Sequence, residues 1–83
     1  LFGKDGVPKE IDMALKIFTF AAKHGDKGAQ KFLGFCYDFG RYGVEKDMSK
    51  AMEFYQLAAN QGDKNAKECL AVLSSRLDDQ FEK

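Results

Sequence analysis

Apolar residues recur along this chain at the spacing of one helix face, three or four residues apart. From 27 to 39 the predicted buried positions are Ala29, Phe32, Leu33, Cys36 and Tyr37. The same spacing selects Met48, Ala51, Phe54, Tyr55, Ala58 and Ala59 further on, and Ile11, Ala14, Leu15, Phe18, Ala21 and Ala22 near the start. No stretch is rich in β-forming residues. The pattern therefore predicts an all-α chain with helices near 9–24, 27–39, 47–61 and 64–80.

Gly-Asp pairs mark the predicted helix junctions. Gly25-Asp26 and Gly62-Asp63 each join a residue that readily ends a helix to one that caps the next. Two glycines in the segment 40–46 interrupt the helical pattern, so we predict a loop there, with Asp47 as the following N-cap.

A shift of 37 residues superimposes the chain on itself. Twelve of the 31 positions from 3 to 33 are then identical, including both Gly-Asp pairs. Each unit comprises a first helix (helix A), a loop and a second helix (helix B). Small residues are expected where helices approach closely: Gly34, Ala58, Ala59, Ala66 and Ala71.

The repeat divides residues 1–83 within a single domain. Residues 1–25 form a partial repeat, 26–62 a full repeat, and 63–83 a partial repeat. In this last unit Ser74 replaces Tyr37 and Leu77 replaces Gly40, while apolar residues continue at helical spacing. We therefore predict a long capping helix that ends the array.

The composition argues against two classes of function, nucleic-acid binding and membrane insertion. Thirteen Lys and Arg residues balance 13 Asp and Glu residues, which argues against a nucleic-acid partner. No apolar run approaches the ~20 residues needed to cross a bilayer, so membrane insertion is not expected.

Catalytic chemistry is not expected either. His24, the only histidine, lies in the last turn of a predicted helix, where it favourably meets the carbonyl ends. Cys36 and Cys69 are predicted to be buried thiols that do not pair in a disulfide. Since no metal-ligand spacing or phosphate loop occurs, we expect no enzyme, metal or cofactor.

The repeat resembles the Sel-one-like repeat family, a relative of the tetratricopeptide repeat. Its pattern of small residues, aromatics and glycines is matched by Ala29, Leu33, Gly34, Tyr37, Gly40, Gly43, Val44, Asp47, Ala51, Phe54, Tyr55, Ala58, Ala59 and Gly62. The unit before it departs at Glu10, where Asp is usual, and at Ile17, where an aromatic is usual. The resemblance covers residues 3–73. It implies a right-handed α/α solenoid of the kind used by adaptors and scaffolds.

In such solenoids the A helices line a concave surface, so the resemblance implies that positions not required by the core bind a peptide or partner protein there. The candidate residues are Lys27, Gln30, Lys31, Phe35, Asp38, Lys67, Glu68 and Val72. Phe35 is the principal candidate because it lies off the buried face, unless a neighbouring helix covers it.

A structural or self-association role is the alternative. About two repeats are fewer than the three or so that usually make a stable array. Without a preceding helix A, Ile11, Ala14, Leu15 and Phe18 lack their partner, and we expect a second copy, an upstream segment or the natural partner to cover them.

Overall fold

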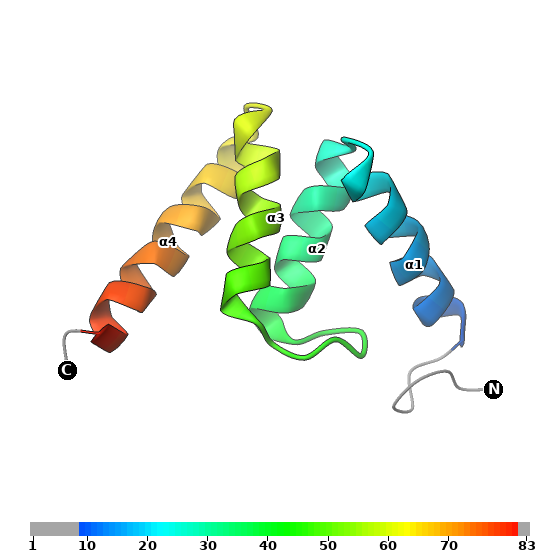
Figure 1. Cartoon of the computed structure of the whole chain (residues 1–83), viewed down its shortest axis with the longest axis horizontal. Coiled ribbons are helices and arrows are strands. Elements are labelled where there is room, and N and C mark those ends of the chain that lie inside the picture. Colours follow the sequence, from blue (N-terminus) through cyan, green and yellow to red (C-terminus); the bar gives the residue numbers. More distant parts are fainter. Residues whose placement is uncertain (1–8, 82–83) are drawn as a thin grey trace.

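The structure, a computed structural model, describes the backbone of residues 9–81 and side chains as far as residue 76, and these residues form four consecutive helices (Figure 1). The helices are α1 (Lys9–Lys23), α2 (Lys27–Phe39), α3 (Met48–Asn60) and α4 (Lys64–Phe81). The described residues contain no strand. These bounds confirm the predicted all-α fold and its helix positions to within one residue.

Both Gly-Asp junctions form tight turns. Gly25 and Gly62 have φ angles of 97° and 91°, a conformation that side chains disfavour. Asp26 Oδ1 accepts the backbone N–H of Ala29 at 2.8 Å, and Asp63 Oδ1 accepts that of Ala66 at 2.9 Å. Each pair therefore ends one helix and begins the next with almost no linker.

The helices are arranged as a thin, open array. Each packs mainly on its neighbours in sequence, and the molecule extends over 44 × 31 × 15 Å. In Figure 1, α2 and α3 lie side by side while α1 and α4 splay outward. This solenoid-like architecture exposes more helix surface than a closed bundle would. None of the helices in the described part is long and apolar enough to cross a bilayer.

The core comprises two clusters of buried side chains. One lies around α3 and includes Ala51, Tyr55, Ala58, Ala59, Ala66 and Leu73. The other joins α1 to α2 through Ala22, Ala29 and Leu33. The small residues Ala58, Ala59 and Ala66 are buried as predicted, but the prediction for Ala71 was wrong: it is exposed because no described helix follows α4 on that side.

The expected open surface on α1 also requires correction. Ile11, Ala14 and Leu15 are partly buried, and the Phe18 ring lies 4.5 Å from that of Phe32. These residues face α2, which folds back along them. Phe18 is nevertheless still 36% exposed, and the most exposed apolar residues of α1, Met13, Ile17 and Phe20, lie on the other side of the helix.

Candidate functional site

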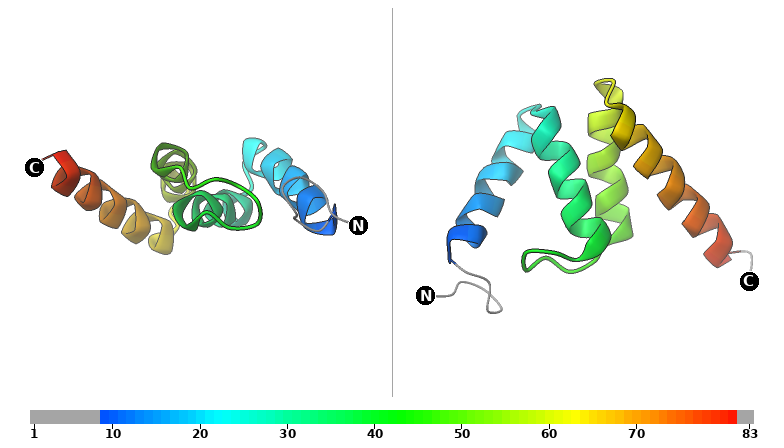
Figure 2. Two further views of the ribbon diagram at one scale, coloured as in Figure 1. Left: turned by 90° about the horizontal axis from the view of Figure 1, so that it is seen from below. Right: turned by 180° about the vertical axis from the view of Figure 1, so that it is seen from behind.

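A groove of about 280 Å³ separates the two A helices of the array, α2 and α4. Seen from behind, α2 and α4 diverge with α3 lying behind the space between them (Figure 2, right). One wall comes from α2 and the other from residues spaced by four along α4. The lining side chains are Phe35, Asp38, Phe39, Glu68, Cys69, Val72 and Arg76.

Apolar side chains dominate the exposed walls of the groove. Phe35, Phe39 and Val72 are 47%, 52% and 49% exposed. The rings of Phe35 and Phe39, one helical turn apart, lie 5.6 Å from each other, and Phe35 meets the buried Tyr55 ring edge-on at 6.4 Å. Because Tyr55 supports it from below, Phe35 is held in place while one of its faces stays open to a ligand.

Three polar side chains, one from each of α2, α3 and α4, meet next to these rings. The Tyr55 hydroxyl of α3 donates to Asp38 Oδ2 of α2 at 3.3 Å, and Arg76 Nη1 of α4 lies 3.7 Å from Asp38 Oδ1. Burial raises the pKa of Tyr55, and the nearby Cys69 and Asp38 raise it further, so its hydroxyl remains protonated. Residues from α2, α3 and α4 thus meet at Asp38, on one wall of the groove.

A second hollow, of about 250 Å³, lies along α2 next to the loop. Its lining residues are Phe32, Phe35, Cys36, Phe39, Arg41 and Tyr42. The rings of Phe32 and Tyr42 are 5.7 Å apart, and the Arg41 guanidinium lies 5.9 Å from the centre of the Phe39 ring. Since Phe35 and Phe39 line both hollows, they form a ridge that is accessible from two sides.

The predicted site residues have different environments. Phe35, Asp38, Glu68 and Val72 line the groove together. Lys27 and Lys67 are exposed but are not among its lining residues. Lys31 forms an ion pair with Asp63 at 3.4 Å, so its ammonium group connects α2 to the start of α4.

Two of the candidates are not surface residues. Gln30 and Asp38 are only 4% and 7% exposed, so the expectation that the core does not need them was wrong. Gln30 donates to the Ala22 carbonyl at 2.9 Å and accepts from Gln61 at 2.9 Å. Both side chains are buried because distant residues provide polar partners for them.

The predicted site did not include three of the lining residues, Phe39, Cys69 and Arg76. Arg76 could have been found by spacing, because Glu68, Val72 and Arg76 follow one another every four residues and share a helix face. Cys69 was assigned wholly to the core, whereas it is only partly buried.

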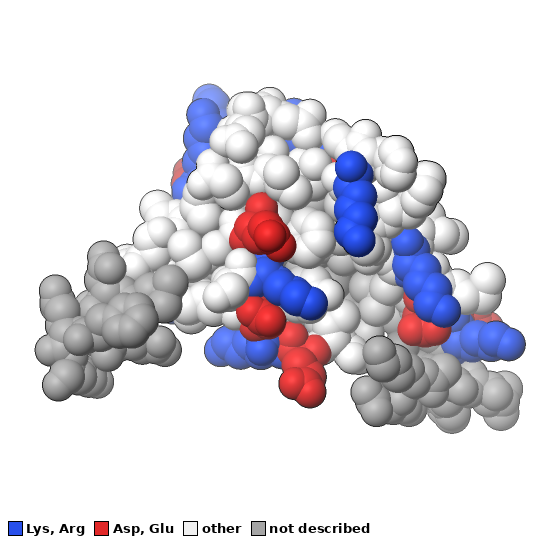
Figure 3. All heavy atoms as spheres, viewed as in Figure 1, with Lys and Arg blue, Asp and Glu red and all other residues white. Residues whose placement is uncertain are grey.

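On the face of the molecule opposite the groove, charged side chains of one sign do not gather into a patch that would mark a binding site. In the view of Figure 3, acidic and basic side chains are interspersed. Among the described residues, no three His, Cys, Asp or Glu side chains gather as metal ligands would.

The repeat also allows the chain to be compared with known protein families. The family model described as Sel1 repeat matches residues 1–26 and 28–63, and both matches end at the Asp of a Gly-Asp junction. The chain belongs to the Sel1 repeat family. No curated protein and no solved structure matches it significantly. Sel1 repeats are generally protein–protein interaction modules of a non-enzymatic type.

Proposed function

We propose that this Sel1 repeat protein is an adaptor that binds a peptide or partner protein in the groove between α2 and α4. The observation that carries the proposal is the exposure of Phe35, Phe39 and Val72 around one groove. Aromatic side chains that are held rigidly and left exposed are typical anchors of protein interfaces.

The size of the groove favours a side chain of a polypeptide over a cofactor. Its volume of about 280 Å³ lies just below the 300–1,000 Å³ usual for small-molecule pockets, and the groove is open along the helices. One apolar side chain of the partner would insert between Phe35 and Val72. Glu68 and Arg76, at the two ends of the α4 wall, would contact polar groups on either side of it.

Affinity measurements on a peptide selected from a library against the wild-type chain test the proposal. Phe35→Ala should weaken binding at least about tenfold, as expected for a central aromatic anchor. Lys31→Glu should have a smaller effect, because Lys31 lies near the groove but is paired with Asp63. Leu57→Ala is the matched control, since Leu57 is an apolar residue of α3 that is 40% exposed outside the groove. Equal affinity for the wild type and Phe35→Ala would reject this groove as the site.

A further inference from the structure

A buried carboxylate oxygen of Asp38, on one wall of the groove, lacks a hydrogen-bond donor. Asp38 is 7% exposed, and its Oδ2 atom accepts from the Tyr55 hydroxyl at 3.3 Å. Among the described residues, no group donates to Oδ1. Arg76 Nη1 lies 3.7 Å from it, which allows attraction between the charges but is too long for a hydrogen bond. Because buried polar groups in folded proteins nearly always have a partner, this oxygen marks a position where the groove can accept a donor from a ligand.

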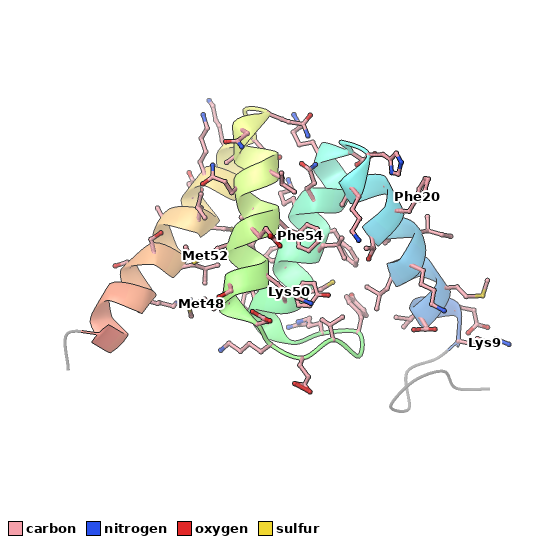
Figure 4. All side chains as sticks on the ribbon, in the orientation of Figure 1. Lys9, Phe20, Met48, Lys50, Met52 and Phe54 are labelled. Atoms are coloured by element: carbon pink, nitrogen blue, oxygen red, sulfur yellow. The ribbon has the colours of Figure 1, made fainter. Side chains whose placement is uncertain are left out.

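Arg76 is held only loosely beside this oxygen. Its side chain is 50% exposed, so it can move into solvent without opening the core. The position of α4 depends mainly on α3, on which it packs. Met48 and Met52 extend from α3 towards α4 and pack against the cluster that contains Leu73 (Figure 4). Release of Arg76 from Asp38 therefore leaves α4 in place.

The other side chains of the groove favour a cation with a flat surface. Two carboxylates, Asp38 and Glu68, and one guanidinium, Arg76, line the groove, which leaves one negative charge in excess. Phe39 is 52% exposed, and the Arg41 guanidinium lies 5.9 Å from its ring centre on the side of the second hollow. A guanidinium stacks on aromatic rings and donates to carboxylates, whereas the lysine ammonium is more strongly hydrated. Arginine is therefore the side chain that best matches this wall.

We propose that the groove recognises an arginine of the partner segment, whose guanidinium displaces Arg76 and donates to Asp38 Oδ1. This inference rests on the proposed function and specifies the partner that the groove takes. Asp38 follows Phe35 by three residues, or about 4.5 Å along α2, and an extended chain advances about 3.3 Å per residue. The arginine therefore lies one or two residues from the apolar side chain that inserts between Phe35 and Val72.

Parallel selections from one randomised peptide library, on the wild type and on Asp38→Asn, test the proposal. Arginine should be enriched at least about threefold over the input at one position with the wild type, and not with Asp38→Asn. Glu53→Gln is the matched control, because it removes a negative charge from an exposed residue of α3 that does not line the groove. It should select arginine as the wild type does. Circular dichroism and urea unfolding report whether each variant is folded.

A change in the peptide tests the same contact without altering the protein. Citrulline has the shape of arginine but no charge, so replacing the selected arginine with citrulline should weaken binding to the wild type at least about tenfold. On Asp38→Asn the same replacement should change the affinity less than about threefold, because the carboxylate is gone.

Arg76→Gln tests the displacement itself. This variant should bind the arginine peptide about threefold or more tightly than the wild type does, since it removes the competing guanidinium. Its affinity for the citrulline peptide should stay within about twofold of the wild-type value, because that peptide does not compete for Asp38. Equal weakening of both peptides would show that Arg76 supports the groove instead of competing for it, and would overturn the displacement.

The remaining outcomes separate this proposal from the proposed function. Groove-bound peptides without enriched arginine, with lysine enriched in its place, or with equal affinity after the citrulline replacement would overturn the proposal and leave the proposed function standing. A library that yields no binding peptide, or only peptides whose affinity is insensitive to Phe35→Ala, would reject the groove and with it both proposals.

Discussion

Tyr55 of α3 packs directly against the backbone of Gly34 in α2. A Cβ atom placed on Gly34 would lie 2.5 Å from Tyr55 Cδ1, closer than a real Cβ contact allows. Tyr55 is fully buried and cannot move aside without disturbing the core. The absence of a side chain at Gly34 therefore allows α2 and α3 to approach closely and positions the residue that supports Phe35.

Gly34→Ala should destabilise the protein by about 1–3 kcal/mol, because the overlap with Tyr55 outweighs the gain in helix propensity. Gly28→Ala is the control: it lies in the same helix, but its Cβ would meet only the Asp26 carboxylate at an ordinary 3.4 Å. That variant should be neutral or up to about 1 kcal/mol more stable. Urea unfolding measures both changes, and equal stability of the two variants would contradict the packing described.

The hydroxyl of Tyr55 stabilises the buried carboxylate of Asp38. Tyr55→Phe should cost about 1–3 kcal/mol, because Asp38 is left buried without a hydrogen-bond donor. In Tyr37→Phe the free energy of unfolding should barely change, since within the described residues the Tyr37 hydroxyl makes no hydrogen bond. If denaturant unfolding shows equal losses for both variants, the Asp38–Tyr55 hydrogen bond contributes nothing measurable.

The two cysteines should differ in reactivity. Burial raises the pKa of the Cys36 thiol, which keeps it protonated and unreactive in the folded protein, whereas Cys69 is partly accessible from the groove. Under native conditions we expect iodoacetamide to modify Cys69 first and Cys36 only after unfolding. Intact mass should also show no loss of two hydrogens, because we predict no disulfide between them. Faster modification of Cys36 would indicate that the α2–α3 packing is open.

The ionisation of Asp63 should make the free energy of unfolding depend on pH. The backbone N–H of Ala66 lowers the pKa of Asp63, against an opposing effect of desolvation, and Lys31 lowers it further. A depressed carboxyl pKa in the folded state adds stability above the ordinary pKa, and this contribution disappears as the pH falls through the folded-state value. Below about pH 5 the wild type should lose more stability than Asp63→Asn, whose amide still caps α4. If the unfolding free energies of the wild type and Asp63→Asn changed in parallel with pH, the ionisation of Asp63 would not contribute to stability.

Local sequence features predicted the helices and junctions because their determinants lie close together in the chain. In each Gly-Asp pair, the glycine adopts a positive φ angle and the aspartate caps the next helix. The aspartate carboxylate accepts a hydrogen bond from the backbone N–H three residues later. The apolar spacing marked the buried face of α2 and α3. The 37-residue repeat then related the two units to each other.

Buried polar residues were not predictable in the same way. Gln30 and Asp38 have partners far along the chain, among them Gln61 and Arg76, so their polar character suggested exposure. The exposed face of α1 was missed because the sequence does not specify on which side of α1 the next helix packs. Four of the groove residues were among those predicted: Phe35, Glu68 and Val72, because each lies off its helix's buried face, and Asp38, whose burial was not predicted.

The central claim, that the groove between α2 and α4 binds a protein segment, is tested most directly by backbone amide chemical shifts during titration with a library-selected peptide. The largest changes should fall on residues 35–39 and 68–76, with much smaller changes on α1 and on the exposed face of α3. Saturable changes confined to α1 or to the loop at 40–47, with the groove amides unmoved, would contradict the claim.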